Sequence, residues 1–209
     1  MLKEVFEKDF YRSYPKRENT VVNVVENVYS AQFSLSDPKS CESGKGTSAC
    51  KLYDTCDHVN LWVHSDEPVH VVSMDNVLEY LKNPLPHNAD YVLCSKEKIR
   101  VVEMTCMEEL YVETGSKTYS HGKRAHAQSQ CEKLLLMLHS CGPIRIFVEH
   151  HAQKEAIFSW RRTDEPVVLE NSMAYFDTMQ REVERTISTL PMSFGFRFRE
   201  LRYPEILEW

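Results

Sequence analysis

Two acidic residues, Asp90 and Glu103, lie near the ends of one short segment, residues 89–105 (ADYVLCSKEKIRVVEMT). The segment predicts two short strands joined by a tight turn, because apolar runs flank a charged centre with Lys96 and Glu97 at its tip. Antiparallel pairing across that turn would place Asp90 directly opposite Glu103. Like charges at opposed positions destabilise a strand pair unless something offsets them. The pattern therefore indicates a place for a cation.

A divalent metal ion would serve as that cation. Mg²⁺ binds through one or two carboxylates and water and leaves positions open for a substrate phosphate, and Mn²⁺ accepts the same oxygen ligands. Such a metal activates water and stabilises the charge that develops when a phosphodiester is cleaved. The alternative is that Asp90 caps a turn after Asn83-Pro84-Leu85-Pro86 and that Glu103 is an exposed strand residue. Both interpretations fit these residues.

The segments before the two acids predict helices and strands. The first 33 residues predict helix, because valines and a tyrosine recur there at helical spacing, and this helix would carry Glu26. Residues 59–65 and 69–74 are rich in β-branched residues and predict two short strands. A short helix with Asp75 as its N-cap is expected to follow.

The segments after the two acids begin with a long predicted helix, Gly122–Ser140. A Gly-Pro pair ends it, and one apolar stripe runs along it: Ala127, Cys131, Leu134, Leu135 and Leu138. Residues 143–151 and 155–162 predict a hairpin, and residues 172–190 predict another helix. Residues 193–201 predict a last strand with a buried aromatic face.

The segments NADYVL (88–93) and VVEMT (101–105), with the helix Gly122–Ser140 and the strand expected after it, resemble the PD-(D/E)XK nuclease-like superfamily. Its members carry an Asp at one strand, an acid–x–Lys triplet on the next, and then a helix and a further strand. The resemblance covers residues 20–160. It implies a single α/β domain with a mixed central sheet flanked by helices, a restriction-endonuclease-like αβββαβ core plus a C-terminal helix and strand.

The same resemblance implies a nuclease that depends on a divalent metal and cleaves the phosphodiester bonds of DNA or RNA. Asp90 and Glu103 would be ligands of Mg²⁺ or Mn²⁺, and Glu26 would be the accessory helical acid found in many members. The sequence departs from the motif at Thr105, which stands where the lysine belongs. Thr105 carries no positive charge to orient water or support the transition state.

Two explanations of Thr105 compete. In the first, Lys123 or Lys133 of the following helix replaces the missing lysine, and Gln130, seven residues after Lys123 and on the same helix face, positions water or phosphate. In the second, the fold has lost catalysis and acts as a protein-interaction or regulatory module. The net charge of −6 favours the second explanation, because non-specific affinity for nucleic acid comes from Lys and Arg.

The chain as a whole is expected to form one domain, residues 1–209, with a flexible loop at residues 34–56 and a C-terminal extension at residues 163–209. A local basic patch over residues 117–133 would contact nucleic acid, and the other expected partner is a protein. We expect no membrane association and a cytoplasmic location, because the sequence contains neither a long apolar run nor the pattern of a secretory signal.

The loop at residues 34–56 and the residues just after it contain a second set of potential metal ligands: Cys41, Cys50, Cys56 and His58. Three cysteines and a histidine can hold a structural zinc. The final interval is too short for a CCCH zinc finger, so we expect free thiols in a loop rather than a zinc site.

Overall fold

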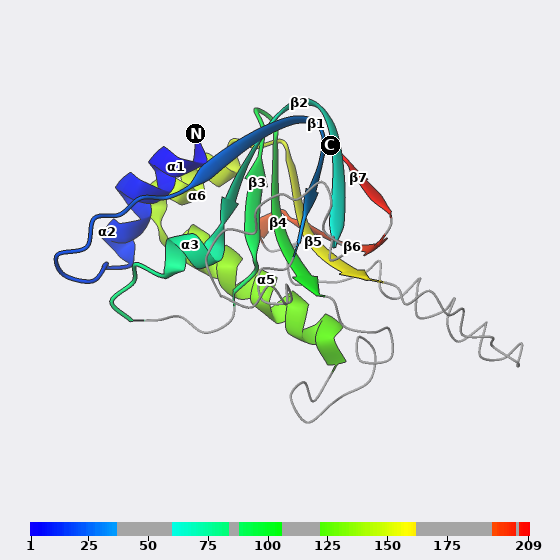
Figure 1. Ribbon diagram of the computed structural model, residues 1–209. Coiled ribbons are helices and arrows are strands. Elements are labelled where there is room, and N and C mark those ends of the chain that lie inside the picture. Colours follow the sequence, from blue (N-terminus) through cyan, green and yellow to red (C-terminus); the bar gives the residue numbers. More distant parts are fainter. Residues whose placement is uncertain (37–59, 84–87, 106–121, 162–193, 204) are drawn as a thin grey trace, which may run out of the picture.

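The computed structural model describes residues 1–36, 60–83, 88–105, 122–161, 194–203 and 205–209. Most of the predicted loop, the four potential zinc ligands and the predicted helix at residues 172–190 lie outside these ranges. Within them, the chain forms a mixed seven-stranded sheet with helices packed against one face (Figure 1). The predicted α/β class with a mixed central sheet is confirmed.

The N-terminal segment is helical only over its first part, in α1 (Leu2–Val5), the π-helical η1 (Phe6–Phe10) and α2 (Tyr11–Ser13). Its buried side chains recur every four residues, at Leu2, Phe6 and Phe10. This spacing keeps them on one face, which packs into the core between the helices and the sheet.

The predicted helix across the later part of the first 33 residues is wrong, because β1 (Glu26–Leu35) occupies it and pairs antiparallel with β2 (Leu61–Ser73). Only Val28 of β1 is β-branched, so this strand follows from its pairing with β2, a tertiary contact that overrides the helical spacing. The two strands predicted at residues 59–65 and 69–74 are parts of the single strand β2. The β1–β2 register shifts just before Ala31, whose φ of 65° lies in the left-handed region. Such a bulge bends the strand.

The hairpin that carries the two acids forms as predicted, from β3 (Tyr91–Cys94) and β4 (Lys98–Thr105). The N–H of Ser95 donates to the carbonyl of Lys98 over 2.9 Å and closes the turn. Tyr91 pairs with Val102 and Cys94 with Ile99, so the predicted register is confirmed. The short helix before this hairpin, α3 (Met74–Leu78), has Ser73 rather than Asp75 at its N-cap.

The long helix α5 (Gly122–Ser140) has the predicted bounds, and its apolar stripe is buried. The segment predicted as the next strand instead forms α6 (Gly142–Glu149), with Pro143 in its first turn. Ile144 and Val148, four residues apart, are its buried positions. The next strand, β5 (Gln153–Arg161), pairs parallel with β4 rather than in a hairpin. Parallel neighbours require a long crossover, which the two helices provide.

The C-terminal strands join the same sheet. β6 (Arg197–Tyr203) pairs parallel with β5, and Phe196 and Phe198 are buried as the predicted aromatic face. The strand order is β1-β2-β3-β4-β5-β6, and β7 (Ile206–Glu208) returns to pair parallel with the first part of β2. The sheet therefore curls, so that β2 contacts β1 on one side and both β3 and β7 on the other.

Two hydrophobic cores result from this curl. One lies between the helices and the sheet, and it includes residues of α5, α6 and the N-terminal helical segment. The other lies on the opposite face, and its fully buried members come from strands alone, among them Leu93, Val102 and Leu207. Side chains of odd-numbered residues from Ile99 to Thr105 in β4 thus point toward the helices, and those of even-numbered residues toward the second core.

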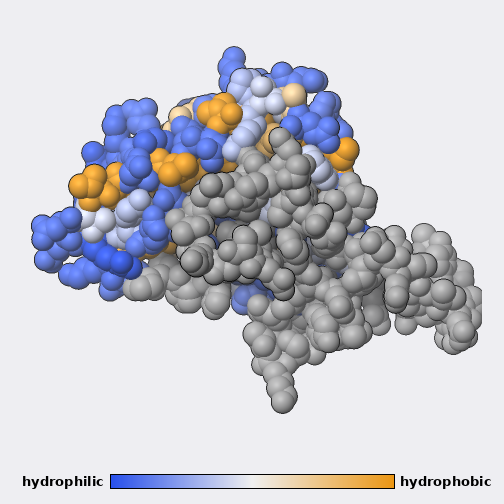
Figure 2. Space-filling view, in the orientation of Figure 1, coloured by the Kyte–Doolittle hydropathy of each residue, from blue (hydrophilic) through white to orange (hydrophobic). Residues whose placement is uncertain are grey.

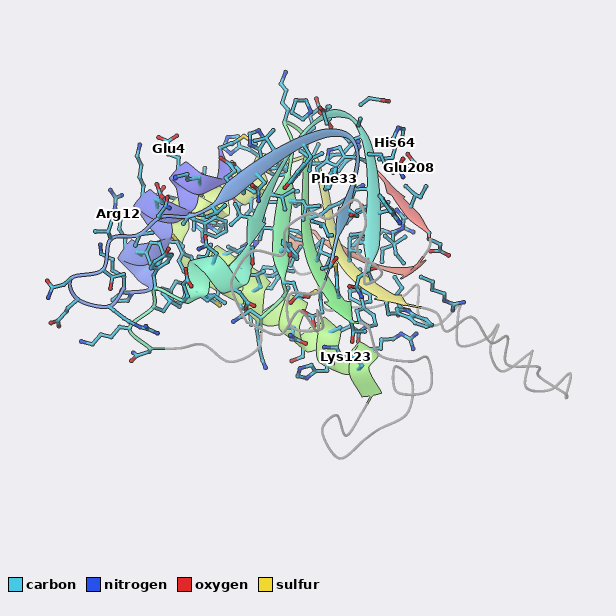
Figure 3. All side chains as sticks on the ribbon, in the orientation of Figure 1. Glu4, Arg12, Phe33, His64, Lys123 and Glu208 are labelled. Atoms are coloured by element: carbon cyan, nitrogen blue, oxygen red, sulfur yellow. The ribbon has the colours of Figure 1, made fainter. Side chains whose placement is uncertain are left out.

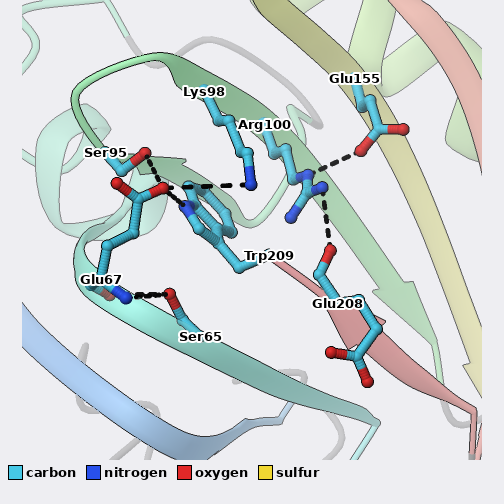
Figure 4. Close-up of polar contacts among 8 residues, drawn as sticks. All are labelled: Ser65, Glu67, Ser95, Lys98, Arg100, Glu155, Glu208 and Trp209. Carbon is cyan, nitrogen blue, oxygen red and sulfur yellow. Dashed lines mark hydrogen bonds and ion pairs between the residues drawn. The ribbon is translucent and has the colours of Figure 1, made fainter.

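Arg100 of β4 points to the face of the sheet opposite the helices, where it links β5 to the C-terminal strand (Figure 4). Its Nε donates to Glu155 Oε2 over 2.7 Å, and its Nη2 donates to the carbonyl of Glu208 over 3.1 Å. The guanidinium carbon lies 4.4 Å from the centroid of the Trp209 ring. Burial lowers the pKa of Arg100, and the charge of Glu155 opposes that shift.

Glu67 binds the indole N–H of Trp209. Its Oε1 accepts hydrogen bonds from Trp209 Nε1 at 3.0 Å and from Ser95 Oγ at 2.9 Å (Figure 4). The ammonium of Lys98 lies 4.0 Å from the same oxygen. One carboxylate oxygen of Glu67 thus links β2 to the β3–β4 hairpin and to the residue that follows the C-terminal strand.

Most apolar side chains that reach the surface are scattered. Figure 2 shows separate hydrophobic spots among hydrophilic residues on the described part of one face. Among the described residues, the exposed large apolar side chains are Met1, Val21, Val25, Val28, Leu136, Ile146 and Ile206. None of the helices within the described ranges has the length and apolar character needed to cross a membrane.

Candidate functional site

Asp90 lies in a bend directly before β3, and its backbone and side chain both bind neighbouring elements. Its N–H donates to the Val102 carbonyl over 2.9 Å, and its own carbonyl accepts from Met74 N–H over 2.8 Å. Its Oδ2 accepts a hydrogen bond from Met104 N–H over 2.8 Å. Continuing the β3–β4 register by one residue puts Asp90 opposite Glu103. The Asp90 carboxylate therefore accepts a hydrogen bond from one backbone N–H, that of Met104, and Asp90 also faces the second acid.

Glu103 is buried, which contradicts the interpretation that it is an exposed strand residue. Its side chain points to the helix-covered face, where Glu103 Oε1 accepts a hydrogen bond from Lys123 Nζ over 3.0 Å. Glu103 is 2% exposed and Lys123 is 7% exposed. Lysine and glutamate are seldom buried unless they are paired. A cation does offset the opposed acids, and it comes from the protein itself.

The start of α5 brings Lys123 to this position. Figure 3 places Lys123 at the end of α5 that lies beside the tip of β4, far from the N-terminal helical segment that carries Glu4 and Arg12. The contact between this helix and β4 follows from the burial of its apolar stripe against the sheet. The predicted proximity of Lys123 to the acids is therefore present.

Gln130 lies two turns further along α5 and extends the cluster. Its Oε1 is 3.5 Å from Lys123 Nζ, and its Nε2 donates to the Asn88 carbonyl over 3.2 Å. Both Gln130 and Asn88 are buried. Among the described residues, Asn88 Nδ2 makes no hydrogen bond. A chain of polar contacts thus runs from Asn88 through Gln130 and Lys123 to Glu103.

Asn88 was missed by the sequence analysis as a member of this cluster. The available signal was its position two residues before Asp90, at the same end of the strand. Its contact with Gln130 involves the backbone carbonyl, which any residue type could supply. No pattern of side-chain types could therefore have identified it.

Cys131 of α5 is fully buried, and the charges of the same cluster affect its thiol. Burial raises the pKa of Cys131 well above its ordinary value, the charges of Glu103 and Asp90 raise it further, and Lys123 opposes them. A buried thiol whose pKa is raised is less reactive than an exposed thiol with an ordinary pKa.

Two other predicted site residues, Lys133 and Glu26, lie outside the cluster, whereas Thr105 lies at the end of the predicted strand. Thr105 is buried at the end of β4, where its carbonyl accepts from Asn60 Nδ2 over 3.0 Å. Lys133 is exposed on α5 and is not part of the buried cluster. Glu26 belongs to a strand, so its assignment as a helical acid is wrong.

The carboxylate of Glu26 has partners of its own, two strands away from Asp90. It accepts from the Met1 amino group at 2.9 Å and from Leu2 N–H at 2.7 Å, and it contacts His70 Nδ1 at 3.0 Å. Burial alone would raise the pKa of Glu26, but the hydrogen bonds from Met1 and Leu2 and the nearby positive charge lower it. Glu26 thus anchors the N-terminal helical segment to the sheet.

The predicted basic patch at residues 117–133 is largely neutralised where it is described. Lys123 is paired with Glu103, and Arg124 forms a two-point ion pair with Glu200 of β6. Lys133 is exposed, and the part of the patch before residue 122 lies outside the described residues. The patch does not form one continuous basic surface over its described part.

The cluster offers a magnesium ion two carboxylate ligands, so water and phosphate would have to supply the rest of the coordination. Among the described residues, no cluster of three or more His, Cys, Asp or Glu side chains could hold a metal ion. Asp90 and Glu103 provide two carboxylates, which match the one or two that Mg²⁺ uses when substrate phosphate and water complete its coordination. Two carboxylates and one ammonium leave the cluster with a net negative charge. This charge favours the binding of a metal cation.

No protein-family model, no curated protein and no solved structure matches this chain. Roles for the residues of the cluster therefore follow from its own geometry and chemistry.

Proposed function

We propose that the protein is a divalent-metal-dependent nuclease in which Asp90 and Glu103 bind Mg²⁺ or Mn²⁺ and Lys123 serves as the lysine of the site. The observation that carries this proposal is the 3.0 Å contact between Lys123 Nζ and Glu103 Oε1 in a buried position. A lysine beside paired carboxylates supplies the positive charge that Thr105 lacks.

The order and direction of the strands support the proposal. Asp90 stands at the start of β3, Glu103 lies on the antiparallel neighbour β4, and a helical crossover leads from β4 to the parallel strand β5. This succession is the one expected of a PD-(D/E)XK core. The lysine comes from the crossover helix instead of the third position of the motif.

In this proposal the metal, Lys123 and Gln130 have different roles in phosphodiester cleavage. The metal, when bound, would polarise a phosphoryl oxygen and lower the pKa of a bound water. Lys123 would stabilise the negative charge on the phosphate, since an ammonium aimed at developing charge in a buried site is effective. Gln130 would hold Lys123 in place through its Oε1, which is anchored because its Nε2 donates to the Asn88 carbonyl.

The test combines metal binding with digestion. Asp90→Asn keeps an oxygen acceptor for Met104 N–H and removes one negative charge. Glu97→Gln is the matched control, because it removes one charge from the exposed tip of the same hairpin. Calorimetry with Mn²⁺ and Mg²⁺ is run alongside digestion of single- and double-stranded DNA and RNA. We expect wild type and the control to bind metal and cleave one polymer, and Asp90→Asn to do neither. Cleavage that survives in Asp90→Asn would refute the assignment.

A second function is favoured by one specific feature, namely that Lys123 already offsets the charge of Glu103. In that case the lysine replaces the metal permanently, and the domain is a catalytically inactive nuclease-like fold that binds a protein partner. Folded wild-type protein that neither binds Mn²⁺ nor cleaves any of the four polymers would support this function.

A further inference from the structure

We infer that metal and phosphate bind this site cooperatively, because Lys123 competes with the metal for Glu103 until a phosphodiester attracts the lysine away. This inference rests on the proposed function and adds a form of regulation to it: the carboxylate becomes available to the metal when the substrate arrives.

The competition follows from the contact geometry. Glu103 Oε1 already accepts a hydrogen bond from Lys123 Nζ at 3.0 Å, and both side chains are buried. A divalent ion on the same carboxylate would lie close to an ammonium in a site with little water, where repulsion between like charges is strong. Metal binding therefore requires Lys123 to move away from Glu103.

Lys123 has a second acceptor that makes such a movement feasible. Gln130 Oε1 lies 3.5 Å from Nζ, and its amide is fixed because its Nε2 donates to the Asn88 carbonyl. A phosphate oxygen on that side would form a charge-assisted hydrogen bond with Lys123, which is stronger than a bond to a neutral amide. The phosphate would thus take over the lysine and leave Glu103 to the metal.

The coupling must be reciprocal. If phosphate raises the affinity for metal by a given factor, metal raises the affinity for phosphate by the same factor. Couplings between two binding sites are commonly about 5-fold to 150-fold. With one direct ion pair exchanged, we expect a factor of about 10 or more.

The experiment measures Mn²⁺ affinity by calorimetry on the full chain, with and without a phosphorothioate dinucleotide as a cleavage-resistant phosphate probe. In wild type, the dinucleotide should tighten Mn²⁺ binding about 10-fold. Lys123→Met removes the ammonium at similar volume, and it should bind Mn²⁺ more tightly than wild type without the probe and show no tightening with it. Lys123→Gln keeps a hydrogen-bond donor for Glu103 without the charge, and it should behave in the same way if Lys123→Met does not fold.

Several results would overturn the inference. Equal or weaker Mn²⁺ binding in the folded Lys123 variants would show that the lysine does not compete, and unchanged affinity in wild type with the dinucleotide would show that the coupling is absent. No Mn²⁺ binding in wild type or in either variant would refute it as well. Digestion keeps the two proposals distinct: coupling without cleavage refutes only the nuclease, and cleavage without coupling refutes only the cooperativity.

Discussion

Removing the ammonium of Lys123 should destabilise the metal-free protein, because Glu103 would remain buried without its cation. At the observed 3.0 Å between Lys123 Nζ and Glu103 Oε1, the attraction is about 5.5 kcal/mol for an effective dielectric constant of about 20. Part of that attraction offsets the cost of removing both charges from water. Breaking one partner of a buried pair commonly costs about 3–5 kcal/mol. We expect Lys123→Met to lower the free energy of unfolding by about 3 kcal/mol.

The same reasoning makes a different prediction for the double variant. Lys123→Met with Glu103→Leu removes both charges and leaves apolar side chains between α5 and β4. Replacement of a whole buried ion pair by apolar residues of similar volume is often neutral or stabilising. The double variant should therefore lose less than about 1 kcal/mol, which corresponds to a coupling of about 2 kcal/mol or more between the two positions.

Urea unfolding, followed by tryptophan fluorescence in the presence of a chelator, measures these differences. Arg145→Met is the control, because it breaks an exposed pair with Glu149, whose closest atoms are 3.8 Å apart. Such helix-surface pairs contribute about 0.3–0.5 kcal/mol. A loss below about 1 kcal/mol in Lys123→Met, or a double variant as unstable as the sum of its single variants, would refute the role of the ion pair.

Three further predictions concern positions outside the cluster. Arg100→Leu should lower the free energy of unfolding by about 3 kcal/mol, because Glu155 loses its buried partner and Trp209 loses its cation; an unchanged urea midpoint would contradict this. Burial lowers the pKa of His139, so the unfolded chain takes up a proton more readily there and the fold loses stability as pH falls through about 6.5. His139→Phe should therefore lose less stability than wild type between about pH 7 and pH 5, and equal losses in parallel urea titrations would count against this role. Ala31→Gly should raise the thermal midpoint by relieving the left-handed conformation, a gain of about 1 kcal/mol, and calorimetry that shows a loss would exclude strain at this position.

The parts of the fold that were predicted correctly depend on local interactions. The β3–β4 hairpin has the predicted register because its turn at Lys96 and Glu97 is short and fixes which residues face each other. The helix Gly122–Ser140 was predicted at both ends, since a long apolar stripe with a Gly-Pro stop has few alternatives. Lys123 and Gln130 were placed on one helix face by the helical period alone.

The incorrect predictions concern short apolar segments whose partners are distant in the sequence. Residues 143–151 contain a run that suits either a strand or a buried helix, and periodicity alone does not separate the two. Its helical form follows from packing of Ile144 and Val148 into the core and from the parallel arrangement of β4 and β5, which requires a crossover. The strand β1 was mistaken for a helix for the same reason. That error grouped Glu26 with Asp90 and Glu103, whereas its partners are Met1, Leu2 and His70.

The sequence by itself determined that Asp90 and Glu103 oppose each other, because the distance between them along the chain is short and the turn fixes the register. Only the tertiary structure decided what offsets their charge. Whether the cation is Lys123, Lys133 or neither depends on how α5 lies on the sheet, since two lysines of one helix can differ completely in burial. The same packing brought Asn88 to Gln130 through a backbone carbonyl, a contact that residue types do not encode.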